Sequence, residues 1–167
     1  MPLFEPYADF KTIIDIKPSY LKEIGIKGLI LDVDNTLTTH DNPVPLENLD
    51  KWLEEIKKSG IIMMIVSNNH SERVEPFAKL LDLDYVSDGK KPLSDGFKRA
   101  ANLMKLSKKE IAVVGDQIFT DILGGNLWGA KTILVQPIEL EKTRFFKVKR
   151  CLEKPIIKRY NKRNASK

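Results

Sequence analysis

The sequence predicts an α/β domain with a doubly wound parallel sheet in three layers and no cap domain. Short apolar runs of strand length alternate along the chain with segments whose apolar residues recur at helical spacing. This alternation is typical of parallel strands joined by crossover helices that cover both faces of one sheet. Three of the apolar runs end in acids, hydroxyls or amides, and ligands bind beyond the carboxyl ends of the strands in such sheets.

The expected elements follow from these runs. We expect strands at residues 27–33, 61–67, 85–86, 111–115 and 132–135. We expect helices at residues 46–59, 71–81, 94–105, 120–128 and 139–154, and one or two short helices within residues 1–27. Asp9 and Ser19 are expected to cap these first helices, and Ser107 with Glu110 has the spacing of a capping box.

Length and composition restrict the class of protein. The 167 residues suit one domain, and 42% of them are apolar, which is enough for a core. The longest apolar run, residues 61–66, is far shorter than the ~20 residues that cross a bilayer, and the first residues do not resemble a signal peptide. The one cysteine, Cys151, can form neither an internal disulfide nor a thiolate zinc site. We therefore expect a cytoplasmic protein.

Charge is distributed unevenly along the chain, whose formal net charge is +5. Residues 142–167 hold eleven Lys or Arg and one acid, whereas the preceding residues hold 17 basic and 22 acidic side chains. We expect residues 1–153 to form the domain, and residues 154–167 to form a basic, disordered tail that attracts an anionic membrane surface or RNA. In the expected last helix, Phe145, Val148 and Leu152 share a face that should pack on the sheet, although a basic amphipathic helix can also lie on a membrane.

Polar side chains at the ends of three strands form the candidate site. They are Asp32, Asp34 and Thr36 after the first expected strand, Ser67 and Asn68 after the second, and Asp116 and Asp121 after the fourth, with Lys91 lying between the last two groups. Because parallel strands end at one edge of a sheet, these residues can converge. Carboxylates with an ammonium and small donors suit a hard cation and a phosphate, and the lack of a His or Cys cluster disfavours zinc.

Each of these residues also has a purely structural interpretation. Asp32, Asp34, Ser67 and Asp121 belong to residue types that favour turns and helix caps. Lys90 could be the functional lysine in place of Lys91, although Lys91 directly precedes Pro92. The two histidines, His40 and His70, follow candidate loops and are compatible with either substrate contact or a surface turn.

Together the segments resemble the four motifs of the haloacid dehalogenase (HAD) superfamily of phosphohydrolases. The resemblance runs from Leu29 to Asp121 and is carried by residues 31–37 (LDVDNTL), 66–69 (VSNN), 90–92 (KKP) and 114–121 (VGDQIFTD). It is most specific to the small YqeG-like class III subgroup, which includes mitochondrial phosphatidylglycerophosphate phosphatases.

The resemblance implies a role for each candidate residue. Asp32 would be the nucleophile that forms an aspartyl-phosphate, and Asp34 the general acid and base. Thr36, Ser67, Asn68 and Lys91 would bind phosphate. The family uses Mg²⁺, which Asp32, the backbone carbonyl of Asp34 and Asp116 would hold, with Asp121 as a further carboxylate near the ion.

The spacing of the motifs leaves no room for a cap domain. Asp34 and Ser67 are separated by 32 residues and Ser67 and Lys91 by 23, and each interval is filled by one expected helix and one strand. An open site admits phosphate on a large surface. Through the resemblance, we expect dephosphorylation of phosphatidylglycerophosphate at the membrane surface. Two alternatives stay open: a phosphatase of a soluble ester or phosphoprotein, and a non-catalytic RNA- or ribosome-binding module that uses the basic tail.

Overall fold

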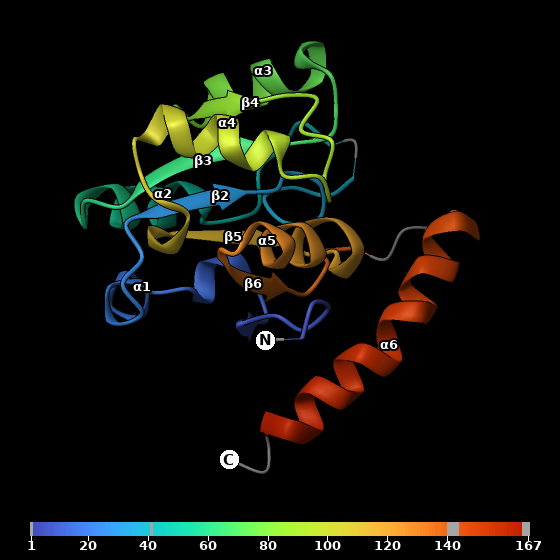
Figure 1. The fold of residues 1–167 in the computed structure, drawn as a ribbon. Coiled ribbons are helices and arrows are strands. Elements are labelled where there is room, and N and C mark those ends of the chain that lie inside the picture. Colours follow the sequence, from blue (N-terminus) through green and yellow to red (C-terminus); the bar gives the residue numbers. More distant parts are fainter. Residues whose placement is uncertain (1, 41, 140–143, 165–167) are drawn as a thin grey trace.

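The fold is a three-layer α/β structure, as the sequence predicts. The computed structural model describes residues 2–40, 42–139 and 144–164. Six parallel strands form one sheet in the order β1-β6-β5-β2-β3-β4 (Figure 1). They are β1 (Ala8–Phe10), β2 (Gly28–Leu31), β3 (Ile62–Val66), β4 (Asp84–Val86), β5 (Ile111–Gly115) and β6 (Lys131–Val135). The strand order reverses between β2 and β5, and ligands of open α/β sheets bind at the carboxyl ends of the strands at such a point.

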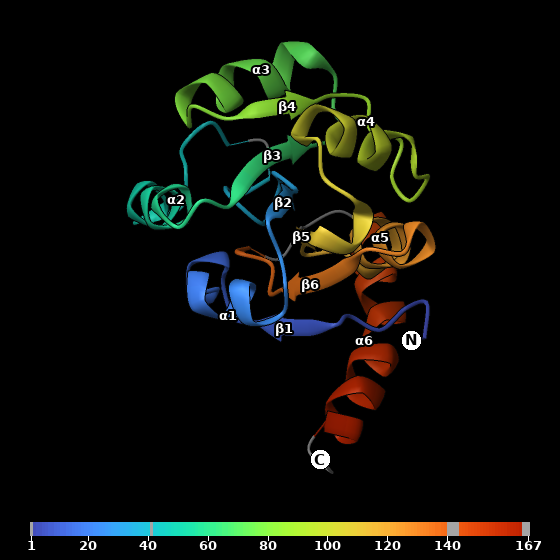
Figure 2. The ribbon, with the colours of Figure 1, turned by 60° about the vertical axis from the view of Figure 1, so that its left-hand side comes forward.

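Helices cover both faces of the sheet (Figure 2). They are α1 (Pro18–Glu23), α2 (Leu49–Lys58), α3 (Ser71–Leu80), α4 (Asp95–Met104), α5 (Leu123–Trp128) and α6 (Arg144–Asn164), with short turns η1 (Ile13–Asp15), η2 (Lys108–Glu110) and η3 (Ile118–Ile122). Alternate residues of a strand face opposite layers: Leu29 and Leu31 pack with α1, α2 and α3, whereas Ile30 packs with α4 and α5. The capping box of Ser107 and Glu110 is confirmed on η2.

The start of the chain differs from the prediction. Strand β1 lies where only short helices were expected. A strand of three residues is too short to show an alternating pattern in the sequence, and β1 is held by its pairing with β6, far along the chain. Asp9 lies within β1, and Ser19 lies inside α1, which begins after Lys17. Neither residue is therefore the cap that we expected.

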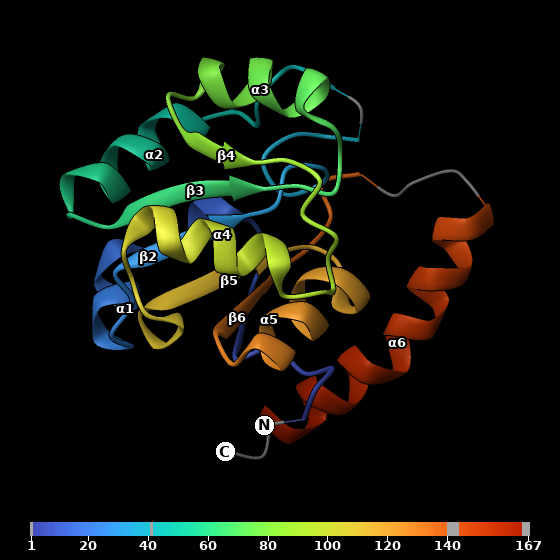
Figure 3. The ribbon, with the colours of Figure 1, turned by 45° about the horizontal axis from the view of Figure 1, so that its top comes forward.

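The prediction of a disordered tail is wrong for residues 154–164, because helix α6 continues through them to Asn164. Contacts distant in sequence hold this half of the helix. Tyr160 is buried, and Ile156 and Ile157 pack on a small cluster formed by Ile118, Ile122 and Leu134. Arg163 forms an ion pair with Glu5, so the last turn of α6 lies near the N-terminal segment (Figure 3). The basic composition of this segment gave no indication of these contacts with distant parts of the chain.

The face of α6 that packs on the domain is also not the expected one. Val148 and Leu152 are 61% and 59% exposed, and the side chain of Phe145 lies outside the described part of the structure. The packing face instead carries Glu153 and Tyr160, so an apolar stripe of α6 faces solvent. Among the described residues, no helix combines the length and the hydropathy needed to traverse a bilayer.

Candidate active site

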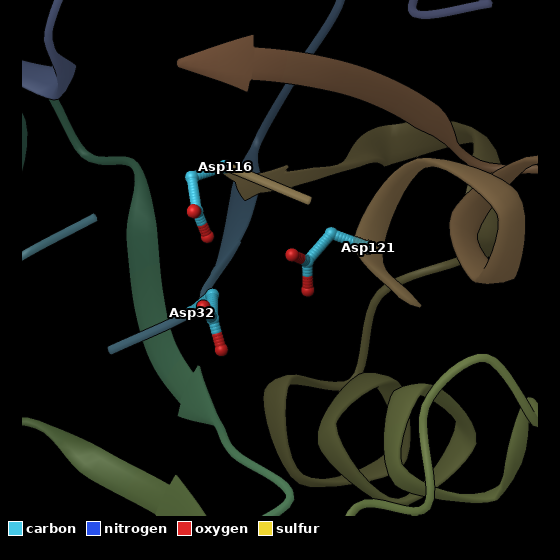
Figure 4. Close-up of side chains that lie close together, drawn as sticks. All are labelled: Asp32, Asp116 and Asp121. Atoms are coloured by element: carbon cyan, nitrogen blue, oxygen red, sulfur yellow. The ribbon is translucent and has the colours of Figure 1, made fainter. Parts of the chain in front are cut away.

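Three buried carboxylates meet at the carboxyl end of the sheet. Asp32, Asp116 and Asp121 each place a carboxylate oxygen within 4.8 Å of the other two, and the three side chains border one common space (Figure 4). Exposed fractions of 9%, 2% and 1%, respectively, place them away from solvent. These are three of the four residues that the sequence predicted around a metal ion.

Strand ends and a π-helical turn position these acids. Asp32 directly follows β2, and its backbone N–H donates to the carbonyl of Val114 in β5 at 3.0 Å. Asp116 follows β5, and Asp121 lies in the π-helical turn η3. A side chain at Gly115 would place its Cβ only 2.3 Å from Cγ of Asp121, so this position requires glycine. The close approach of strand and turn brings Asp121 into the cluster.

Lys91 supplies the cation inside this cluster. Its Nζ donates hydrogen bonds to Oδ1 of Asp32 at 2.5 Å and to Oδ1 of Asp121 at 2.7 Å, and its side chain is only 4% exposed. Lys90, in contrast, is exposed. The side chain of Asn68 fixes the backbone of Lys91, accepting its N–H at 2.7 Å and donating to its carbonyl at 3.0 Å.

Burial dominates the electrostatics of the site. Burial and, to a smaller extent, the nearby Asp121 carboxylate raise the pKa of Asp32 to about 7, against the opposing charge of Lys91. For Lys91, burial acts to lower the pKa, but the carboxylates of Asp121 and Asp32 outweigh it and raise the pKa above its usual range. The cluster thus holds three buried carboxylates and one ammonium, which contacts two of them. This excess of negative charge on oxygen ligands fits a hard divalent cation such as Mg²⁺.

Two buried hydroxyls lie at the same edge of the sheet. Ser67 follows β3, is 2% exposed and accepts the backbone N–H of Asn69 at 3.1 Å. Thr36 lies beyond the end of β2, is 1% exposed, and its Oγ1 has no hydrogen-bond partner among the described residues. A buried hydroxyl without a partner is costly. Both remain, as the sequence predicts, candidates to donate to a phosphate.

The Asp34 carboxylate does not belong to the three-acid cluster but faces α3. Asn69 donates from Nδ2 to Oδ2 of Asp34 at 2.8 Å, and the Arg73 guanidinium forms a short ion pair with Oδ1. Nδ1 of His40 lies 3.7 Å from the same Oδ1. The predicted metal contact of Asp34 is through its backbone carbonyl and is unaffected by this orientation.

Sequence reasoning missed Arg73 as a member of the site. It lies on α3, 39 residues from Asp34, and no motif marks it. Of the two histidines that the sequence left open, His40 lies beside Asp34. His70 precedes α3, is exposed, and its Nδ1 lies 2.6 Å from Oδ1 of Asp88. The structure thus assigns the two histidines to different surroundings.

Comparison with known proteins agrees with this site. A sequence model of the haloacid dehalogenase-like hydrolase family matches residues 39–129, more than half of the chain. The chain belongs to this family. The matched segment of this HAD-like hydrolase contains Ser67, Lys91, Asp116 and Asp121 and begins shortly after Asp32 and Asp34.

Relatives of this HAD-like hydrolase carry phosphatase names. "Probable phosphatase YqeG" of Bacillus subtilis (strain 168) is 40% identical over 154 residues, which cover 92% of this chain and 90% of that protein. "Phosphatidylglycerophosphatase GEP4, mitochondrial" of Saccharomyces cerevisiae is 35% identical over 128 residues, which cover 67% of this chain and 68% of that protein. The HAD-like hydrolase described here is therefore a phosphatase.

Solved structures support the fold alone. An uncharacterised protein from Listeria monocytogenes serotype 4b superposes with a TM-score of 0.59 at 21% identity, covering 71% of this chain and 85% of that chain. NagD from Escherichia coli K-12 gives a TM-score of 0.58 at 14% identity, covering 72% and 93%, respectively. Both structures thus share the fold with more than two thirds of this HAD-like hydrolase.

Proposed function

We propose that this phosphatase is a Mg²⁺-dependent phosphomonoester hydrolase that works through an aspartyl-phosphate on Asp32 and acts on phosphatidylglycerophosphate at a membrane surface. The observation that carries the proposal is the buried cluster of Asp32, Asp116 and Asp121, with Lys91 hydrogen-bonded to Asp32 and Asp121. Such a concentration of buried charges is typical of a catalytic site.

The proposed reaction has two balanced steps. In the first, a carboxylate oxygen of Asp32 bonds to phosphorus while the bond from phosphorus to the leaving oxygen breaks, and Asp34 gives that oxygen a proton. In the second, water attacks the phosphorus, Asp34 takes a proton from this water, and the bond to Asp32 breaks to release inorganic phosphate. Lys91 and Ser67 hold the phosphoryl oxygens as charge spreads over them.

The donor set supports magnesium as the cofactor. Asp32, Asp116 and the backbone carbonyl of Asp34 would hold Mg²⁺, with Asp121 as a further carboxylate beside it. Mg²⁺ prefers oxygen ligands and retains several waters, so few protein ligands are sufficient. When bound, it would offset the negative charge of the carboxylates and of the phosphoryl group.

The names of two relatives and the shape of the site support a lipid substrate. Besides the yeast protein, "Phosphatidylglycerophosphate phosphatase 1, chloroplastic/mitochondrial" of Arabidopsis thaliana is 29% identical and covers 93% of this chain, although only 47% of that protein. Among the described residues, the intervals between the motifs hold only helices and strands of the central domain and no inserted cap. A site without a cap would accept a phosphate that stands on a bilayer.

The exposed side of helix α6 supports the proposed contact with a membrane. Its outward side exposes the apolar residues Val148 and Leu152 together with the basic residues Lys154, Lys158 and Arg159. A helix that presents both apolar and basic residues to solvent is suited to an anionic lipid surface. Each Lys or Arg near such a surface contributes on the order of 1 kcal/mol, decreasing with salt.

Phosphate release with Mg²⁺ tests the enzymatic part of the proposal. The Asp32→Asn variant should lose activity on all esters and should no longer bind beryllofluoride, which mimics a phosphoryl group on aspartate. Asp95→Asn, an exposed acid on α4, is the matched control and should keep both properties. Beryllofluoride binding that survives the Asp32→Asn change would remove Asp32 from the proposed role.

Substrate preference and membrane binding are tested separately. Phosphatidylglycerophosphate should be hydrolysed faster than soluble esters or a phosphopeptide, and a preference for either of the latter would replace the lipid proposal. In flotation with phosphatidylglycerol liposomes, Leu152→Asp should reduce binding, whereas Leu103→Asp on α4, which is similarly exposed, should not. Retention of RNA instead of liposomes would favour the RNA-binding alternative for the basic helix.

A further inference from the structure

A pocket opens beside Asp34, on the side of the site that faces α3. Its volume is about 150 Å³, well above the ~10–15 Å³ that one water needs. Ser67 and Arg73 supply polar lining, and Val33, Pro43, Val74 and Phe77 supply apolar lining. We call this hollow the Arg73 pocket. The pocket is therefore lined by a candidate phosphate-binding hydroxyl, a guanidinium and an apolar wall.

Two residues that line the Arg73 pocket, Asn69 and Arg73, contact the carboxylate of Asp34, the proposed general acid. Asp34 must reach the leaving oxygen to donate its proton, since general acid catalysis requires hydrogen-bond contact. Arg73 contacts Oδ1 of the same carboxylate, so its guanidinium lies one carboxylate away from that oxygen. A group attached to the leaving oxygen on this side would therefore lie near Arg73.

We propose that the Arg73 pocket receives the leaving alcohol of the substrate, and that Arg73 binds a second anionic group on this alcohol. The inference rests on the proposed function, because it assigns Asp34 as the acid that faces the leaving oxygen. For phosphatidylglycerophosphate the second anion is the phosphodiester that joins the leaving glycerol to the lipid. The apolar wall of Val33, Pro43 and Phe77 lies against the glycerol carbons.

The chemistry of arginine allows this double contact. A guanidinium carries five N–H donors in a planar fork, so one arginine can contact two anionic groups. The Arg73 side chain lines the pocket and is 32% exposed. A phosphodiester carries one negative charge and two non-bridging oxygens. The planar guanidinium of an arginine can donate to both of these oxygens. Arg73 would therefore select esters with a second phosphate over simple monoesters.

Two soluble substrates isolate this selection from membrane binding. Glycerophosphoglycerol phosphate has the monoester and the phosphodiester of the lipid but no acyl chains, whereas glycerol 3-phosphate has the monoester alone. We would measure kcat/KM of the full chain for both with Mg²⁺, before and after Arg73→Lys and Arg73→Gln. Lys79→Ala removes a cation from the same helix outside the pocket and is the matched control.

The ratio of the two kcat/KM values decides the outcome, because it does not depend on the fraction of folded protein. We expect the unaltered protein to prefer the two-phosphate substrate, and Arg73→Gln to reduce this preference by about tenfold, the size of one charged hydrogen bond, chiefly through KM. Arg73→Lys should retain part of it, and Lys79→Ala all of it.

Other results would overturn the inference in distinguishable ways. If Arg73→Gln lowers kcat/KM by the same factor for both substrates, Arg73 acts only by positioning Asp34, and the proposed phosphatase mechanism survives. If the unaltered protein shows no preference for the substrate with two phosphates, the Arg73 pocket does not bind the second phosphate. If no ester is hydrolysed, the proposed function falls, and the inference falls with it.

Discussion

The Glu153 carboxylate accepts the backbone N–H of Ile118 at 2.9 Å, joining helix α6 to the first residue of η3. Glu153 is the one acid among residues 142–167, and it is 1% exposed within an otherwise basic segment. Turn η3 carries Asp121, which belongs to the three-acid cluster. The bond therefore ties the position of α6 to the position of a candidate metal-site carboxylate.

Replacing Glu153 should loosen this connection. Glu153→Ala leaves a buried N–H of η3 without its charged acceptor, so the free energy of unfolding should fall by about 1.5–3 kcal/mol. Glu153→Gln keeps an acceptor oxygen and should cost less. Thermal and urea unfolding measure the effect, and Lys158→Ala on the exposed side of α6 is the control. Equal stability of Glu153→Ala and Lys158→Ala would show that the contact is energetically unimportant.

The raised pKa of Asp32 predicts how the metal-free protein responds to pH. The carboxyl releases its proton near pH 3.8 in the unfolded chain but near pH 7 in the fold. Between these values the folded protein holds a proton that the unfolded chain has lost, so the free energy of unfolding falls as pH rises. The pKa of Lys91 is raised above 10.5, so Lys91 is protonated in both states throughout this window.

The Asp32→Asn variant isolates this contribution. Because asparagine cannot ionise, the variant should lose part of the decline in stability between about pH 4 and 7 and should melt above the unaltered protein at pH 8. Melting temperatures in EDTA across that range provide the measurement. Parallel curves for the two proteins would mean that Asp32 is not destabilised by its burial.

Addition of Mg²⁺ should offset the loss of stability that the ionised, buried Asp32 causes in the metal-free protein. Mg²⁺ that binds only the folded protein stabilises it by about 2.7 kcal/mol at a hundredfold excess over Kd. Asp116→Asn removes one of the three converging carboxylates and should abolish most of this gain, whereas Asp95→Asn, exposed on α4, should retain it. Thermal shift against Mg²⁺ concentration is the readout. An unchanged shift in Asp116→Asn would place the ion elsewhere.

The strand ends of the site were predictable because two local signals coincide there. Asp32 and Asp116 each follow a run of residues buried on both faces, and such runs in a parallel sheet end at one common edge. The sequence could therefore indicate that distant acids converge. It could not indicate the partner of each acid, since Arg73 reaches Asp34 across 39 residues from a helix surface.

The orientation of α6 was not predictable for a related reason. Helical spacing shows which residues share a face, but it does not show which edge of that face packs: Leu152 is exposed, whereas Ile156, one turn further on, packs against the domain. The choice between them depends on the cluster around Ile118 and on the buried bond of Glu153, both supplied by η3. Likewise, β1 exists because β6 offers an edge, and residues 8–10 alone contain no sign of it.

Thr36 allows a test that separates catalysis from stability. Its Oγ1 is buried and lacks a hydrogen-bond partner within the described residues, so Thr36→Val removes no bond in the fold and should leave the free energy of unfolding within about 1 kcal/mol. If this hydroxyl donates to the phosphate, kcat/KM should fall by about tenfold, the value of one hydrogen bond to a charged group.

Thr132→Val is the matched control for this substitution. Thr132 is equally buried, but its Oγ1 donates to Oδ1 of Asn126 at 3.0 Å, away from the acid cluster. Its replacement should lower stability by about 1 kcal/mol or more, because Asn126 loses a partner, and should change kcat/KM little. The two variants should thus show opposite patterns in unfolding and in phosphate release. A loss of stability without a loss of activity in Thr36→Val would assign its hydroxyl to the fold and remove it from the phosphate site.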